Sequence, residues 1–347
     1  MAKSTLTIQC RFTAQNREQV LQPFHQRLAA ARAAGDSLAE IDALAELGRA
    51  WSRQRDYAHA IAAYEQQLKV ARAIGARSME ALALGAMGAA HISSGDAQRA
   101  VELLDQELEI LREIGDSPGE AEALAALSGA YLAQGEYHSA VMAAEQSLDI
   151  QYQVGDATWE CDALLNLAAS YAALGNVRYA AVAYEAELAY ARANEEPRLE
   201  AFVLSELGQA YMKLDQPGHA VECFKQELAL RRQLNDRPGE GRAHVNLGGA
   251  YFTVDRTPRA LHHYRLALAI YRQIEDRCGQ YAALHNLGTL YLATGDRRSA
   301  TACYEQQVTI AERLGNRAQE AKARENLKVA RSTRPIEGSD WQELRPM

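Results

Sequence analysis

Three asparagines stand at equivalent places along the sequence and carry side chains suited to binding another polypeptide. Asn166, Asn246 and Asn286 occupy the same position of a sequence repeat, and each directly precedes a leucine. A carboxamide offers both a hydrogen-bond donor and an acceptor, so it can pair with the backbone of an extended peptide. The same group can instead join two neighbouring helices of its own chain. The residue types leave both interpretations open.

Further candidate binding residues lie close to these positions or to their equivalents elsewhere in the chain. The polar candidates could bind charged groups of a partner, and the apolar candidates could form an exposed track for hydrophobic side chains. They are Arg49, Arg53, Glu206, Gln209, Lys213 and Arg242 in the polar set, and Met212, Phe252 and Leu292 in the apolar set. For the apolar set, burial between helices is the competing interpretation.

Sequence patterns of catalysis or cofactor binding are not found. The nine histidines scatter without a His-x-x-x-His pair, and the five cysteines include no Cys-x-x-Cys pair. No glycine-rich phosphate loop or dinucleotide turn occurs. His262 and His263, with Cys223 one repeat earlier, are the one weak metal candidate. We therefore expect a protein that is not an enzyme and needs no cofactor or metal.

The elements that position these residues repeat with a constant period of 40. Within a repeat the apolar residues are spaced as on one face of a helix, for example Leu44, Leu47 and Trp51. Each repeat therefore predicts two amphipathic helices, at 38–54 and 57–74 in the first one. Alanine marks the interval without insertion or deletion, at Ala60, Ala100, Ala140, Ala180, Ala220, Ala260 and Ala300.

Small residues and helix-end signals agree with this reading. Gly48 and Gly208 lie inside first helices, where glycine costs about 1 kcal/mol relative to alanine, so we expect them to allow close helix packing rather than bending. Residues 37–40 and 117–120 read Ser-x-x-Glu, which predicts a capping box with serine as the N-cap. Gly95 stands where a first helix should end in the left-handed conformation.

The repeat boundaries divide the chain into five segments. Half repeats are expected at both ends, because an end repeat has one face without a neighbour. The residues before the N-terminal half repeat alternate between apolar and polar, as in a strand. The residues after the C-terminal half repeat contain Trp341, and this tail could dock into a groove. The segments are an N-terminal leader (1–16), an N-terminal capping helix (17–36), seven repeats (37–316), a C-terminal capping helix (317–333) and a flexible tail (334–347).

The repeats resemble the tetratricopeptide repeat family. Leu207 and Gly208 followed by Tyr211, Ala220 and Phe224 reproduce the family pattern almost unaltered. The usual period of the family is 34, shorter than the one found here, and the proline that ends its second helix is replaced by arginine in most repeats. The chain is therefore most similar to the long-repeat class, which includes Pins/LGN-type and kinesin-light-chain-type adaptors.

This resemblance implies an all-α, right-handed solenoid whose first helices line a concave groove for a peptide or protein segment. In similar adaptors, the asparagine at the position of Asn166 contacts the main chain of the ligand. Chaperone-binding members carry asparagine at the position of Gln209, and this chain has none there, which argues against a chaperone clamp. The resemblance thus implies a protein-interaction scaffold. The alternatives are a self-assembling structural protein or a peptide-sensing regulatory subunit of an enzyme.

Net charge and hydropathy argue against some classes of partner. The net charge of −8 and a pI near 5.7 argue against nucleic acid, and no apolar run is long enough for a membrane span. The first residues lack a secretory leader, so we expect a cytoplasmic protein. Charge is uneven: residues 101–122 are strongly acidic and residues 225–277 are basic. Such a bipolar chain could steer a charged partner or form homo-oligomers through its ends.

Overall fold

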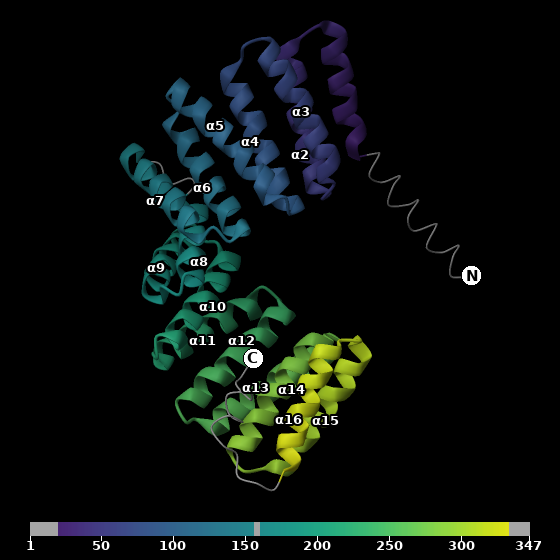
Figure 1. Ribbon diagram of the computed structural model, residues 1–347, viewed down its shortest axis with the longest axis vertical. Coiled ribbons are helices and arrows are strands. Elements are labelled where there is room, and N and C mark those ends of the chain that lie inside the picture. The colour runs from purple at the N-terminus through teal and green to yellow at the C-terminus, as the bar shows by residue number, and fades with distance from the viewer. Residues whose placement is uncertain (1–19, 156–159, 333–347) are drawn as a thin grey trace, which may run out of the picture. The chain divides into compact units, whose positions relative to one another are not determined.

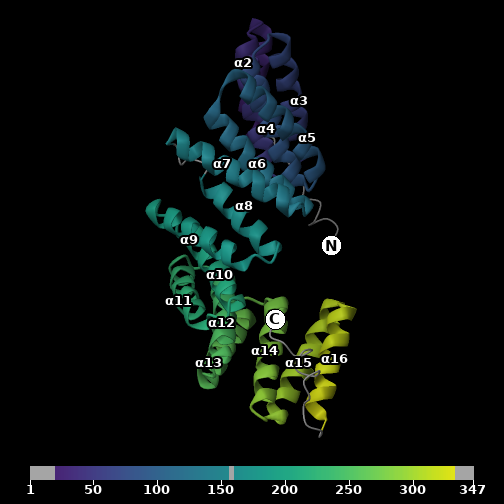
Figure 2. The same ribbon diagram turned by 60° about the vertical axis from the view of Figure 1, so that its left-hand side comes forward.

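Every element that the structure describes is an α-helix (Figures 1 and 2). The computed structural model describes residues 20–155 and 160–332, and the chain forms two compact units, residues 1–176 and residues 177–347. The predicted leader and tail lie outside the described residues. No helix within the described ranges combines the length and apolarity needed to cross a bilayer.

The first unit contains the N-terminal helix, described over residues 20–34, and seven helices that follow it. Figures 1 and 2 show them stacked in chain order. They are α2 (Ser37–Arg53), α3 (Tyr57–Ala73), α4 (Arg77–Ser94), α5 (Ala97–Ile114), α6 (Ser117–Gln134), α7 (Tyr137–Val154) and α8 (Glu160–Ala173).

In the first unit, the two helices of the first repeat, α2 and α3, lie within one residue of the ranges predicted from periodicity.

The second unit contains eight described helices with the same alternation. The helices of the second unit are α9 (Val177–Ala193), α10 (Pro197–Lys213), α11 (Pro217–Gln233), α12 (Arg237–Thr253), α13 (Thr257–Gln273), α14 (Arg277–Ala293), α15 (Arg297–Leu314) and α16 (Arg317–Arg331).

The first helix of each repeat has an even label and the second an odd label. Within each unit every helix packs against the next one, and first helices also contact the first helix of the neighbouring repeat, as α2 does with α4 and α12 with α14. Among the described residues, second helices of neighbouring repeats do not approach each other to this extent. First helices therefore line one side of each unit, and we call their shared surface the first-helix face.

In four of the seven repeats, a glycine on the first helix packs against an aromatic ring of the second helix. A Cβ atom placed on Gly248 would lie 2.5 Å from the ring of Tyr264, and one on Gly288 would lie 2.6 Å from the ring of Tyr304. Both tyrosines are almost fully buried, with exposed fractions of at most 1%. The glycines therefore serve close packing, as the sequence predicted, because a ring from the second helix occupies the space of a side chain.

The helix starts differ from the predicted capping boxes by one residue. Asp36, not Ser37, is the N-cap of α2, and its carboxylate accepts hydrogen bonds from the backbone N–H groups of Leu38 and Ala39 at 3.1 and 3.0 Å. Aspartate accepts such bonds through a charged oxygen and so takes the role predicted for the serine. The predicted left-handed end at Gly95 is confirmed, with φ of 89°.

The glutamates of the predicted capping boxes instead bind the preceding helix. In five places an arginine near the end of a second helix donates its Nε–H to a glutamate in the first turn of the next first helix, at 2.7–2.9 Å. The arginines stand in the slot where the family usually has proline. The pairs are Arg32–Glu40, Arg72–Glu80, Arg112–Glu120, Arg192–Glu200 and Arg232–Glu240.

Candidate functional site

Two of the three candidate asparagines join neighbouring first helices. Asn166 Nδ2 on α8 donates to Ser128 Oγ at 2.9 Å and to the Ala125 carbonyl at 3.2 Å, both on α6. Asn246 Nδ2 on α12 donates to Ser205 Oγ on α10 at 3.4 Å. Of the two interpretations that the sequence left open, these contacts match the helix-joining one. Both residues remain half-buried, so part of each amide still reaches the surface.

Two of the expected site residues are buried in the structure. Asn286 has an exposed fraction of 1% and Leu292 of 3%. Leu292 packs in a cluster with Ala300, Tyr304 and Ala330, because α16 covers this end of the last repeat. Neither residue offers surface to a partner, so for Leu292 the predicted exposed track is corrected to burial between helices.

The polar candidates of the second unit lie together on the first-helix face. Gln209 Nε2 donates to Glu206 Oε1 at 3.4 Å within α10. Burial raises the pKa of Glu206, and the charges of Arg242 and Lys213 oppose that rise. Gln209, Lys213 and Arg242 are exposed. This group therefore presents a mixed surface with two cations around one half-buried carboxyl group.

The remaining candidates divide between surface and core. Arg49 and Arg53 on α2 are exposed. Met212 and Phe252 are partly buried and pack against the main hydrophobic cluster of the second unit. These two apolar side chains therefore belong largely to the contact between repeats.

One exposed position of the first helices was almost wholly missed by the sequence reasoning. It lies between two core positions, as Asp42 does between Ile41 and Ala43, and its side chains are exposed in six repeats. Core packing does not constrain this position, so its chemistry changes from one repeat to the next. Only Arg242 had been selected. The exposed members are Asp42, Leu82, Glu122, Asp162, Phe202 and Arg242.

A second missed position places polar groups beneath the first-helix face. It lies on the second helices directly before the recurrent leucine or valine, and it is buried in all seven repeats and polar in six of them. Ser147 Oγ donates to the Ala121 carbonyl at 2.7 Å, and Gln307 Nε2 to the equivalent Tyr281 carbonyl at 3.3 Å. The sequence contained a signal for this position, because a polar residue recurs there at a spacing that otherwise belongs to core residues. The buried polar members are Gln67, Glu107, Ser147, Glu187, Glu227 and Gln307.

Burial has a large effect on two of these carboxyl groups. It raises the pKa of Glu107 to about 8, and the negative charge of Glu122 adds to the rise. It raises the pKa of Glu227 to about 7, where the charges of Arg231 and Arg242 act in the opposite direction. Both groups therefore hold or share a proton at neutral pH, unlike an ordinary glutamate.

A cleft in the first unit brings both missed positions together. It has a volume of about 400 Å³ and lies between α2, α4 and α6, and we call it the α4 cleft. Asp42, Leu82 and Glu122 come from the exposed position, and Glu107 comes from the buried one. Arg49 lines it too, so one of the predicted site residues belongs to this cleft.

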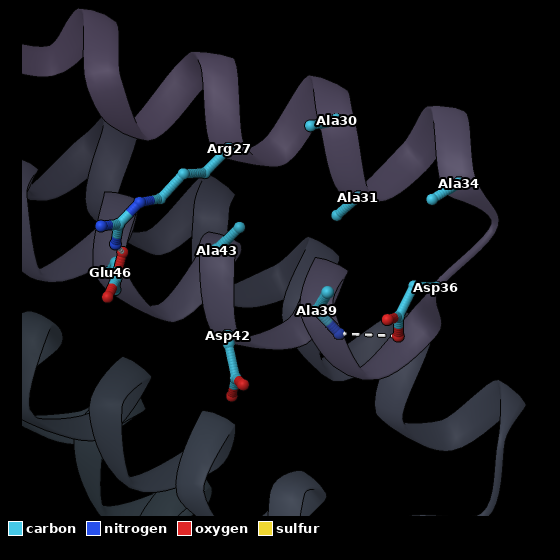
Figure 3. Close-up of a pocket in the computed structure, with 9 residues that line it drawn as sticks. All are labelled: Arg27, Ala30, Ala31, Ala34, Asp36, Ala39, Asp42, Ala43 and Glu46. Atoms are coloured by element: carbon cyan, nitrogen blue, oxygen red, sulfur yellow. Dashed lines mark hydrogen bonds and ion pairs between the residues drawn. The ribbon is translucent and has the colours of Figure 1, made fainter.

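A second hollow lies between the N-terminal helix and α2 (Figure 3). Alanines form most of its wall, and Arg27 Nη1 pairs with Glu46 Oε2 at 2.6 Å across it. Figure 3 shows the Asp42 carboxylate pointing away from the N-terminal helix, and Asp42 also lines the α4 cleft. The hollow offers little chemistry, because its one ion pair is already satisfied.

His263, a member of the weak metal candidate with His262 and Cys223, pairs instead with His244. Arg232 Nη2 donates to His244 Nε2 at 3.3 Å, so His244 carries its proton on Nδ1 and donates to His263 Nδ1 at 2.8 Å. Burial lowers the pKa of both rings to about 4. Cys223 is buried, which raises its pKa to about 11. In the part of the chain that the structure describes, no group of three His, Cys, Asp or Glu side chains could hold a metal ion.

Comparison with protein families identifies the repeats. Two tetratricopeptide repeat profiles match residues 79–153 and 199–273, and residues 43–77 and 283–318, which together cover more than half of the chain. The chain belongs to the tetratricopeptide repeat family. A comparison with curated proteins found no match to the sequence of this tetratricopeptide repeat chain.

Solved structures share the fold of this tetratricopeptide repeat chain at low sequence identity. A Signal Transduction ATPase with Numerous Domains from Pyrococcus horikoshii, which has a tetratricopeptide repeat sensor, aligns over 94% of this chain and 51% of its own, with a TM-score of 0.66 and 14% identity. This chain thus spans about half the length of that protein.

Two further structures align over nearly their whole length. The C-terminal part of a repeat-containing protein from Cytophaga hutchinsonii has a TM-score of 0.55 and 13% identity, and covers 81% of this chain and 98% of its own. BtubC (BKLC) from P. vanneervenii has a TM-score of 0.54 and 20% identity, and covers 63% of this chain and 92% of its own. At these identities the likeness concerns the fold alone.

Proposed function

We propose that this chain is a protein-interaction scaffold that binds a segment of a partner protein along its first-helix face. The repeat fold supports a protein-interaction scaffold in general. The observation that carries the finer proposal is the exposed position that changes character between repeats, from Asp42 through Leu82 to Phe202 and Arg242. A packed core restricts a position to similar residues, whereas a binding surface can vary along its length.

Two exposed apolar side chains support a binding role for this face. Leu82 is 58% exposed and Phe202 is 40% exposed, each on a first helix, with charged residues at the same position of the neighbouring repeats. Large apolar side chains that bind a partner commonly account for a large share of the affinity. Met142 and Val182 are exposed to a similar degree, 61% and 65%, but lie on second helices. The chain therefore contains a matched pair of controls.

The experiment uses a random peptide library displayed on phage and selected on the intact chain. Affinities of the selected peptides are then measured by fluorescence anisotropy. We expect Leu82→Ser with Phe202→Ser to weaken binding by about tenfold or more, which corresponds to about 1.4 kcal/mol. Met142→Ser with Val182→Ser should leave the affinity within about twofold of the unchanged chain.

The outcomes separate the proposed surface from its alternatives. If the second-helix variant loses affinity and the first-helix variant retains it, the partner binds the opposite side and the proposal is wrong. Light scattering over a concentration series tests the self-assembling alternative. A mass that rises steadily with concentration would favour a structural polymer instead of an adaptor.

A further inference from the structure

The α4 cleft has a floor that comes from second helices. Most of its wall belongs to the first helices α2, α4 and α6, but Gln67 reaches it from α3 and Glu107 from α5. Gly85 on α4 makes this possible: a Cβ atom placed there would lie 2.7 Å from the carboxyl carbon of Glu107. The absent side chain therefore opens a passage through which the Glu107 carboxyl group faces the cleft.

Glu107 has no partner in the described part of the chain. Its exposed fraction is 9%, and it forms no hydrogen bond or ion pair with any described residue. Asp42 and Glu122, higher in the same cleft, form no ion pair with described residues either. Arg49 also lines the cleft, and it too forms no ion pair with a described residue. Since a buried polar group is costly unless it has a partner, and three carboxyl groups share this cleft, the cleft is suited to a cation from outside.

The lining of the cleft indicates whether a metal ion or a charged side chain fits it. No described group of three acidic, His or Cys side chains is placed to hold a metal ion, so these carboxylates do not form a metal cage. Between the rim and Glu107 the wall includes the apolar side chains of Met79, Leu82 and Ala86. A lysine or arginine side chain has a matching character, with an apolar stem and a charged end.

We propose that the α4 cleft receives one lysine or arginine side chain of a partner protein, with its stem against Leu82 and Ala86 and its charged end at Glu107. This inference rests on the proposed function, because it assigns one partner side chain to the first-helix face. The carboxyl groups of Asp42 and Glu122, which also line the cleft, add to its attraction for a basic side chain.

Binding of a cation at Glu107 is coupled to the release of a proton. Burial, with the charge of Glu122, raises the pKa of Glu107 to about 8, so the empty cleft holds a proton on this group at neutral pH. Asp42 and Arg49 on α2, Tyr64 on α3 and Glu122 on α6 are the other titratable groups that face it. A cation at Glu107 stabilises the charged form, so binding releases the proton and strengthens as the pH rises toward 8.

The test replaces single charges in the peptides that the library selection yields on the intact chain. Each lysine is replaced by norleucine and each arginine by citrulline, which keep the shape and remove the charge. Affinities are measured for the unchanged chain, for Glu107→Gln and for Glu109→Gln, an exposed glutamate on the same helix that serves as the matched control. Thermal unfolding confirms that both variants are folded.

We expect one basic position per peptide at which neutralisation weakens binding to the unchanged chain and to Glu109→Gln by about tenfold, but to Glu107→Gln by less than about threefold. Affinity for the basic peptide should also rise between pH 6 and pH 8 in the unchanged chain and in Glu109→Gln, but not in Glu107→Gln. Equal losses in all three proteins, or peptides without a recurrent basic residue, would overturn this inference while leaving the proposed function intact. A folded chain that selects no peptide would count against both.

Discussion

Arg112 at the end of α5 donates its Nε–H to Glu120 Oε1 in the first turn of α6, at 2.7 Å. The two residues belong to different repeats, and the same pairing occurs at four other junctions among the described residues. Arg192 uses the remaining edge of its guanidinium for Gln226, one repeat further on, at 2.6 Å. The arginine that replaces the usual proline thus joins successive repeats instead of only extending the second helix.

The first prediction measures this link directly. In a double-mutant cycle with Arg112→Gln, Glu120→Gln and the double variant, we expect a coupling energy of about 0.2–1 kcal/mol, because the guanidinium is half exposed and solvent screens the pair. Urea unfolding gives the free energies of unfolding. A coupling indistinguishable from zero would show that the pair forms without stabilising the junction.

The second prediction concerns a junction that lacks the arginine–glutamate ion pair and into which a substitution should introduce it. Arg272 occupies the same slot, but the residue eight positions later is Gln280, which donates instead to the Tyr271 carbonyl at 3.0 Å. Gln280→Glu should create the ion pair and raise the free energy of unfolding by about 0.5 kcal/mol at low salt. The gain should shrink in high salt, because ions screen a partly exposed pair. A gain independent of salt would contradict the ion-pair explanation.

The third prediction concerns the contact between glycine and the aromatic ring. Gly248→Ala places a methyl group against the buried ring of Tyr264 and should lower the free energy of unfolding by about 1–3 kcal/mol, although alanine favours a helix. Gly218→Ala is the matched control, since a Cβ atom there meets nothing within 4 Å. The control should be neutral or stabilising by up to about 1 kcal/mol. Equal effects at both sites would contradict the packing argument.

The fourth prediction follows from the raised pKa of Glu107. Between pH 4.5 and about pH 8 the unfolded chain has lost this proton while the folded chain keeps it. The folded state therefore binds more protons, and stability falls as the pH rises through that window, by about 1.4 kcal/mol per unit from this group.

Glu107→Gln removes the contribution of Glu107 to the pH dependence of stability. The urea concentration at which half of this variant is unfolded should rise relative to that of the unchanged chain as the pH rises. The difference should level off above about pH 8. Glu109→Gln should run parallel to the unchanged chain at every pH. Parallel curves for Glu107→Gln as well would show that Glu107 titrates as an ordinary glutamate.

The fifth prediction concerns the histidine pair, for which the sign is opposite. Burial lowers the pKa of His244 and His263 to about 4, so between pH 4 and pH 6.5 the unfolded chain binds more protons than the folded one. Stability is therefore lost as the pH falls through this window. His263→Gln should reduce the loss, measured as the urea midpoint from pH 7 to pH 4. An unchanged slope in the variant would contradict a neutral buried pair.

The repeating sequence by itself determined the helices and their order. The constant repeat period, the spacing of Leu44, Leu47 and Trp51 and the small residue at Gly48 predicted two helices per repeat that pack closely. These features depend on contacts within one repeat, so a single repeat carries enough information for them. The family followed from the same residues.

Only the tertiary structure decided which side chains are left for a partner. The asparagine at the position of Asn166 looked equally suited to a ligand and to a neighbouring helix, and the position of Ser128 on the adjacent first helix settled its actual contact. Gly85 lies on α4 and Glu107 on α5, and their contact depends on how these two helices cross. Burial, pairing and access arise between helices and between repeats, and the pattern along one helix does not specify them.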